Sequence, residues 1–457
     1  MQNRRPSVKT VWFVSYAALV FSFFVISPQL RSADAIRKGL KFDFGSGTIA
    51  PGFVRVPPST IYSIERGYGF MQPVEVSPQS GRAARGSLCG DKSFRFSADV
   101  PEGNYNVAIT FGDQNAESVT TVKGEARRLM LEKVSTTPGQ IVTRNFTINV
   151  RTSVLKSGGR VKLKADEQGH FDWDNILTLE FGDSHPCVRT LEITPVDDAV
   201  TVYIAGDSTV TDQSKEPYAA WGQMLPRFFH AGVAIANHAE SGESLKEFIG
   251  EKRLEKIMET IQPGDYLFVQ FTHNDQKPGP NHVDAFTDYK SYLKLYINES
   301  RLRGAIPVLV TSMLRRNFGD DAKIVNTLED FPEAMRQTAK EENVPLIDLN
   351  VMSKAFYEAM GPEKSVRAFV HYPAGTYPGQ TAELKDDTHF NAYGAYELAK
   401  CIVEGIKADK LGIAKFLVEG LSAFDPAHPD SLETWSFPAS PLMQPPTPAV
   451  APAATIR

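Results

Sequence analysis

The chain has 457 residues, of which 42% are hydrophobic, 23% charged and 10% aromatic, and its formal net charge is −5. This composition excludes a wholly disordered, a collagen-like and a polytopic membrane protein, and the acidic balance offers no basic field to a nucleic-acid partner. The three cysteines are too few for a disulfide-rich scaffold, and they lack the spacing of a zinc site.

The N-terminus predicts an export signal. Three basic residues precede an apolar run at 11–26, and small residues follow up to Ala35. This order is typical of a cleaved signal peptide, although the apolar run is long enough to leave an uncleaved anchor as the alternative. We therefore expect residues 1–35 to be a signal peptide and the mature protein to be secreted or periplasmic, without membrane insertion.

Residues 36–183 predict an all-β sandwich, because short alternating or β-branched segments are separated by turn residues. Within this region, Phe171–Asn175 places carboxylates around an aromatic ring, which favours a turn entering a strand and leaves sugar or calcium binding as the alternative. Export would permit a disulfide, for which Cys89 and Cys187 are the plausible pair. The expected strands are 93–100, 104–112, 141–150, 160–166 and 176–182.

After a predicted linker at 184–199, residues 200–423 alternate between apolar runs and amphipathic helical patterns. This alternation predicts a flavodoxin-like, three-layer α/β/α domain, whose sites lie at the carboxyl ends of its parallel strands. The last segment, 424–457, holds eight prolines and is predicted to be a disordered tail. The expected strands are 200–206, 233–239, 265–271, 306–313 and 344–350, and the expected helices are 244–261, 287–304, 331–343 and 391–409.

Four motifs, three at strand ends and one before the last helix, supply the groups that acyl transfer requires. Ser208 is a candidate nucleophile, His389 can act as its base, and Asp386 can orient the imidazole. The N–H groups of Ser208 and Gly242 and the side-chain amide of Asn274 can stabilise an oxyanion. Each motif alone is typical of a turn or a helix cap, so their common position at one sheet edge carries the prediction.

Two neighbouring residues compete with these assignments. His273 is a rival base, but it lacks an acidic partner at the Asp-x-x-His spacing. Asp387 adjoins Asp386 and does not satisfy that spacing either.

The strings around these residues resemble a known family. GDSTVTDQ (206–213), GDYLFVQFTHNDQK (264–277) and DDTHFNAYGA (386–395) are similar to SGNH (GDSL-like) hydrolases, in the rhamnogalacturonan acetylesterase branch. The segment FDFGSGTIAPGFVRV (42–56) resembles the galactose-binding-like domain that often precedes such esterases. The resemblance implies a serine carbohydrate esterase that removes acetyl groups from a pectic polysaccharide, without a metal or organic cofactor.

One residue departs from the branch. Thr272 stands where the branch usually has glycine, and we expect this β-branched residue to affect the fit of the acyl group or sugar. Two other functions stay open: a lipase or thioesterase for longer acyl chains, and a catalytically dead polysaccharide-binding protein. The sequence does not identify the acetylated polymer, the acetyl position or the oligomeric state.

Overall fold

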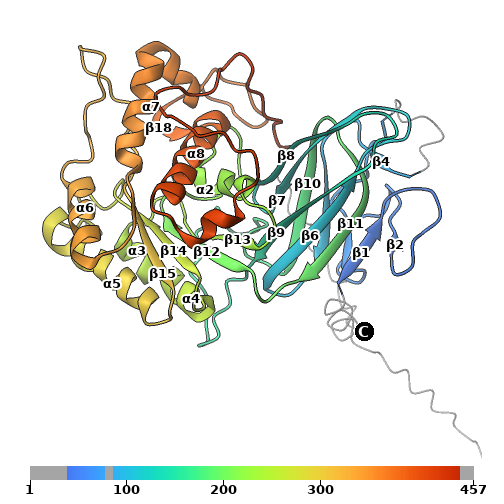
Figure 1. Cartoon of the computed structure of the whole chain (residues 1–457), viewed down its shortest axis with the longest axis horizontal. Helices are drawn as coiled ribbons and strands as arrows, with labels where there is room; N and C mark the ends of the chain where they lie inside the picture. The colour runs from blue at the N-terminus through green and yellow to red at the C-terminus, as the bar shows by residue number, and fades with distance from the viewer. Residues whose placement is uncertain (1–38, 78–85, 443–457) are drawn as a thin grey trace, which may run out of the picture.

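A computed structural model describes residues 39–77 and 86–442, which form two domains side by side (Figure 1). The predicted signal peptide lies outside these residues. Within the described ranges, no helix combines the length and apolar character needed to cross a membrane.

The first domain is a β-sandwich of two sheets. One sheet has the order β2-β1-β11-β6-β9 with β4 paired to β11, and the other has the order β3-β5-β10-β7-β8. Alternate side chains of β6 point inward, which places Val107, Ile109 and Phe111 in the core between the sheets. The strands are β1 Leu40–Asp43, β2 Val54–Arg55, β3 Tyr68–Phe70, β4 Leu88–Cys89, β5 Phe94–Asp99, β6 Gly103–Phe111, β7 Ser118–Gly124, β8 Arg128–Thr136, β9 Val142–Val150, β10 Ile176–His185 and β11 Cys187–Pro195.

Two segments of this domain differ from their predictions. The predicted linker at 184–199 is too long, because β11 lies within it and pairs with both β1 and β6 near the middle of its sheet. The predicted strand at 160–166 forms no strand. Its backbone is used differently: the Lys162 N–H donates to the Glu251 carbonyl in the second domain over 3.0 Å.

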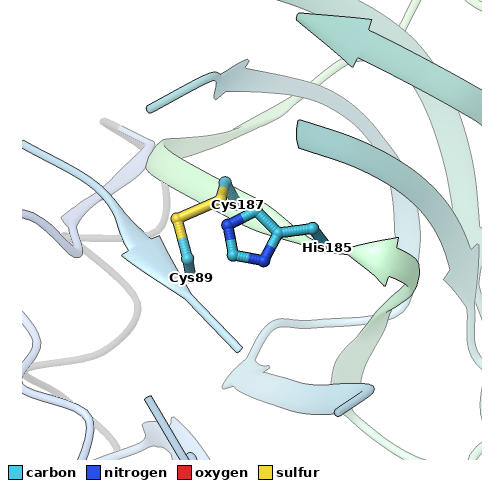
Figure 2. Close-up of side chains that lie close together, drawn as sticks. All are labelled: Cys89, His185 and Cys187. Atoms are coloured by element: carbon cyan, nitrogen blue, oxygen red, sulfur yellow. A yellow bond between two sulfur atoms is a disulfide. The ribbon is translucent and has the colours of Figure 1, made fainter. Parts of the chain in front are cut away.

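Cys89 and Cys187 form a disulfide between β4 and β11, as the sequence led us to expect (Figure 2). The His185 ring lies beside the bond, and all three residues are buried. Because each sulfur is bonded to the other, the cluster offers no thiolate to a metal ion. Cys401 is free and buried in the last helix.

The disulfide closes a loop between residues 98 positions apart. We expect the double substitution Cys89→Ser/Cys187→Ser to lower the free energy of unfolding by about 2–5 kcal/mol, because the open chain gains conformational entropy when it unfolds. Denaturant unfolding of the variant and of the oxidised and reduced wild type measures this. Equal midpoints for oxidised and reduced wild type would contradict the expectation.

The second domain is built on a five-stranded parallel sheet with the flavodoxin-like order β13-β12-β14-β15-β16. Helices α3 to α6 pack on one face, where Phe248, Tyr296 and Phe331 are buried. Helices α2, α7 and α8 pack on the other face, as the three-layer prediction requires. The strands are β12 Val200–Gly206, β13 Val233–Asn237, β14 Tyr266–Gln270, β15 Ile306–Val310 and β16 Leu346–Ile347, with a hairpin of β17 Phe369–Tyr372 and β18 Leu384–Phe390. The helices are α2 Trp221–Met224, α3 Leu245–Gly250, α4 Arg253–Thr260, α5 Lys290–Arg301, α6 Phe331–Glu342, α7 Leu349–Lys364 and α8 Ala392–Ala408, with short turns η2 Leu225–Phe228, η3 Ala285–Tyr289, η4 Ser365–Ala368 and η5 Gly412–Phe416.

Two predicted elements of this domain change their boundaries. The helix expected at 244–261 is two helices, because Lys252 between α3 and α4 takes the left-handed conformation with φ of 64°. The strand expected at 344–350 is only β16. Asp348 ends it by capping α7, since its side chain accepts the Val351 N–H.

The predicted disordered tail is also ordered in part. Residues 424–442 pack on both domains, and the Trp435 ring stacks on Phe437 at 5.9 Å and meets Tyr393 at 5.4 Å. Prolines remove N–H donors but keep their carbonyls, and the buried Lys123 ammonium of the sandwich donates to the Pro438 carbonyl over 2.6 Å. Side-chain donors of the first domain therefore order a segment that cannot join a sheet. The rest of this segment lies outside the described residues.

Candidate active site

A tight turn after β12 presents Ser208. The Asp207 carboxylate accepts the Thr209 N–H over 2.9 Å and the Thr209 hydroxyl over 2.7 Å, which fixes the turn. Gly206 stands just before this turn. A larger residue would not fit there, because a Cβ would lie 2.8 Å from Val210 Cγ2 and 3.1 Å from the Gln270 carbonyl oxygen. Ser208 is half-buried beyond the carboxyl end of β12, where a ligand can reach it.

Ser208, His389 and Asp386 form one hydrogen-bonded chain. The Ser208 hydroxyl lies 2.8 Å from His389 Nε2, and His389 Nδ1 lies 2.7 Å from Asp386 Oδ2. Ser208 lies in the turn after β12, whereas Asp386 and His389 lie on β18, about 180 positions later in the chain. This arrangement can transfer a proton from the serine hydroxyl to the imidazole.

The carboxylate of this chain is held in its ionised form. Burial raises the pKa of Asp386, but the hydrogen bond and charge of His389, with the N–H groups of His389 and Thr388, lower that pKa to about 2. Asp386 therefore favours the Nδ1–H tautomer of His389, which leaves Nε2 free to accept a proton from Ser208.

The neighbouring Asp387 is bonded elsewhere. Its carboxylate accepts a hydrogen bond from Arg316 over 2.9 Å and pairs with His371 Nε2 at 2.8 Å. Of the two adjacent aspartates, the one at the Asp-x-x-His spacing is therefore the one that contacts His389. The sequence placed this motif simply before the last helix, whereas the structure places it on β18, paired with β17.

The other predicted residues follow β13 and β14, the strands on either side of β12. Gly242 has φ of 82°, a conformation that favours glycine, and a Cβ there would lie 3.4 Å from Lys164 Nζ. The Asn274 amide donates to the Glu243 carbonyl over 2.9 Å, and its own carbonyl accepts from Lys277 Nζ over 2.7 Å. An amide has two N–H bonds, so one donor of Asn274 stays available for an oxyanion.

His273 and Thr272 have different surroundings from Ser208. His273 is 3% exposed, and burial followed by the charge of Arg315 lowers its pKa well below the ordinary range. Thr272 is buried, its hydroxyl contacts the Phe271 carbonyl, and it lies 3.2 Å from the Tyr289 hydroxyl. These contacts place the Thr272 side chain in the core beside Tyr289. They give no support to the expectation that Thr272 affects the fit of the acyl group or sugar.

Sequence reasoning missed several residues around the triad. Lys277 lies three positions after Asn274, a spacing that could have shown the contact. The Tyr218 ring lies 5.9 Å from the His389 ring, while Lys164 and Arg127 come from the sandwich. No local pattern connects these two sandwich residues to the site, because their partners lie about 80–90 positions away.

A cavity of about 420 Å³ adjoins the triad through Tyr218. The two domains and the C-terminal segment all contribute to it. Its lining includes Arg127, Lys215, Glu216, Gln380, Leu384 and Pro441.

The Phe171–Asn175 cluster is part of the contact between the domains. Asp172 accepts the Ala126 N–H over 2.9 Å, and the Trp173 indole donates to Glu167 and meets the His238 ring. Its carboxylates are therefore engaged within the chain, as the interpretation as a turn requires.

A parallel sheet with a hydrogen-bonded serine, histidine and aspartate at its carboxyl edge has the arrangement of groups that serine hydrolases require. The comparisons agree with this class. Residues 204–395 match the model of the GDSL-like Lipase/Acylhydrolase family, and residues 40–150 match the galactose-binding domain-like model of beta-agarase and YXIM esterase-like proteins.

Two relatives and one solved structure illustrate the likeness. The chain is 42% identical over 221 residues to the rhamnogalacturonan acetylesterase RhgT of Bacillus subtilis, covering 48% of this chain and 94% of the relative. It is 29% identical over 392 residues to the uncharacterized esterase YxiM of Bacillus subtilis, covering 83% of this chain and 93% of the relative. The crystal structure of YxiM aligns with 82% of this chain and 99% of its own, with a TM-score of 0.43 and 26% identity. The chain therefore belongs to the GDSL-like lipase/acylhydrolase family of carboxylic ester hydrolases.

Proposed function

We propose that this chain is a secreted or periplasmic serine esterase that removes acetyl groups from a pectic polysaccharide, rhamnogalacturonan in particular. The observation that carries the proposal is the unbroken hydrogen-bonded chain Ser208–His389–Asp386. The relatives' names support the substrate, since RhgT is a rhamnogalacturonan acetylesterase. The sequence of residues 1–35 supports export.

The reaction follows from the geometry. His389 Nε2 takes the Ser208 proton as Oγ attacks the acetyl carbonyl, and the resulting imidazolium is stabilised by Asp386. The oxyanion accepts hydrogen bonds from the N–H groups of Ser208 and Gly242 and from the Asn274 amide. The sugar oxygen leaves with the proton from His389. Water, activated by the same imidazole, then releases acetate and restores Ser208.

The cavity beside Tyr218 suits a sugar chain. Lys215, Glu216 and Gln380 supply donors and acceptors, while Leu384 and Pro441 supply apolar surface for the faces of sugar rings.

An intact triad also argues against a dead binding protein, because loss of the nucleophile or base is the simplest route to inactivity.

Substrate choice tests this proposal. We expect faster acetate release from acetylated rhamnogalacturonan than from acetylated xylan, and rates on p-nitrophenyl esters that fall as the acyl chain lengthens. A preference for acyl chains of eight or more carbons would favour a lipase. Equal acetate release from both polymers would remove the pectic assignment while keeping the esterase.

The oxyanion contacts give a second test. Asn274→Ala is expected to lower kcat for p-nitrophenyl acetate by about 10²–10³-fold, because one preorganised donor is lost. Lys277→Met should cost less, since Asn274 keeps its amide and loses only the cation that orients it. A larger loss in Lys277→Met than in Asn274→Ala would contradict this division of roles.

A further inference from the structure

The sandwich contacts the catalytic domain through the edge strands of its two sheets. Strands β8 and β9 end the two sandwich sheets, and β13 ends the catalytic sheet. Leu129 of β8 is fully buried within the core cluster of the catalytic domain. The turn before β8 holds two non-glycine residues in the left-handed conformation, Glu125 at φ of 53° and Arg127 at φ of 67°. Such conformations persist only where the surroundings hold them, and they concentrate at functional sites.

Arg127 clamps the segment that follows the nucleophile. Its Nη1 donates to the Gln213 carbonyl over 2.9 Å and to the Tyr218 carbonyl over 3.0 Å, and its Nη2 pairs with Glu216 at 2.6 Å. Both carbonyls belong to residues whose side chains contact the triad. The Gln213 side chain donates to the Ser208 carbonyl over 2.8 Å, and the Tyr218 ring faces His389.

Arg128 reaches the same loop by a second route. Its Nε lies 3.1 Å from Asp212, and Asp212 accepts a hydrogen bond from the Asn237 amide over 2.9 Å. That amide also donates to the Val210 carbonyl, two residues after Ser208. The sandwich therefore contacts the loop at both Asp212 and Gln213, and Asn237 of β13 connects Asp212 to Val210.

The sandwich supports the oxyanion side as well. Lys164 donates to the Ser241 carbonyl and pairs with the Glu243 carboxylate, the residues on either side of Gly242. Basic side chains from the first domain thus contact the segments around both Ser208 and Gly242.

We propose that Arg127 is a positioning residue of the esterase, and that the β-sandwich completes the active site instead of serving only as an appended sugar-binding domain. Arg127 is 3% exposed, and a buried guanidinium is costly unless its donors are used. Its planar fork reaches two carbonyls and a carboxylate together, which a lysine ammonium on a flexible stem does not reproduce. The contacts fix the distance between Ser208 and His389, on which proton transfer depends. The proposal rests on the triad proposed above.

Arg227 provides a matched control. It crosses the same interface and pairs with Glu132 of β8 at 2.8 Å, and Glu132 also accepts from the Tyr396 hydroxyl on α8. None of these contacts touches the Ser208 loop. Arg227→Ala therefore weakens the contact between the domains without removing the clamp.

The test compares kcat and KM for p-nitrophenyl acetate in full-length variants, at a temperature where circular dichroism shows each to be folded. Arg127→Ala is expected to lower kcat by about 10–100-fold with little change in KM, because small misplacements of reacting groups are expensive. Arg127→Lys, which keeps a cation beside Glu216, should fold like the wild type and still lose kcat. Added methylguanidine should restore part of the kcat of Arg127→Ala and have no such effect on Arg227→Ala.

Two results would overturn the inference: a wild-type kcat in Arg127→Lys and Arg127→Ala, or an equal fall in kcat for Arg227→Ala. Both are distinguishable from failure of the triad, which would appear as unchanged activity in a Ser208 variant.

Discussion

Replacing Ser208 by alanine is expected to lower kcat for p-nitrophenyl acetate, and for acetate release from acetylated polysaccharide, by about 10⁴-fold or more. In the proposed mechanism the Ser208 Oγ becomes acylated, and it lies 2.8 Å from His389 Nε2, the base that accepts its proton. The side chain is half-buried in a turn fixed by Asp207 and Thr209, so its removal leaves the turn in place. The melting temperature should therefore stay close to that of the wild type.

The control for this change is Ser291→Ala. Ser291 lies on the exposed side of α5, where its hydroxyl donates only to the Thr287 carbonyl one turn earlier. This variant should retain the wild-type kcat within about twofold. A fluorophosphonate that labels active serines should mark the wild type and Ser291→Ala but not Ser208→Ala. Full activity or labelling in Ser208→Ala would remove the serine mechanism.

The sheet and the triad positions were predictable because they depend on strong local signals. Each parallel strand is a short apolar run, and the polar residue that follows it must lie at the carboxyl edge of the sheet. Ser208 and Asn274 were found in this way. Asp386 and His389 were found from a three-residue spacing, which holds on strand β18 because Asp386 turns back to accept the His389 N–H.

The split of the 244–261 helix at Lys252 and the end of β16 at Asp348 are local, but the other errors arise from contact between segments distant in the chain. Strand β11 reads as a linker, yet pairing with β1 and β6 makes it part of the sandwich. Residues 424–442 read as disordered, yet Lys123 and Arg95 of the sandwich donate to their carbonyls. Arg127 carried no signal at all. Its proposed role depends on contact between the β7–β8 turn and the loop after Ser208. The hydrophobic periodicity of the sequence does not reveal that contact.

Replacing Asp386 by asparagine is expected to lower kcat by about 10³–10⁴-fold, while the same change at Asp387 should leave kcat within about tenfold of the wild type. The amide of asparagine can donate to His389 Nδ1 and so stabilise the tautomer whose Nε2 carries a proton, which cannot accept the proton of Ser208. Asp387 instead pairs with Arg316 and His371, outside the hydrogen-bonded chain. The two variants differ by one position and make the same chemical change, so a comparable loss in both would show that the carboxylate has been misassigned.

The difference in stability between the wild type and Asp386→Asn should also depend on pH in a defined direction. The folded-state pKa of about 2 lies below the ordinary value of 3.8, so the ionised carboxylate stabilises the native state above pH 3.8 and this contribution disappears as the pH falls through about 2. Asp386→Asn should therefore be less stable than the wild type near neutral pH, and the difference should shrink in acid. Denaturant midpoints measured for both proteins across this range test the sign. A difference that grew as the pH fell would mean that the folded-state pKa of Asp386 lies above 3.8, which would contradict the stabilisation of its ionised form by His389 and Thr388.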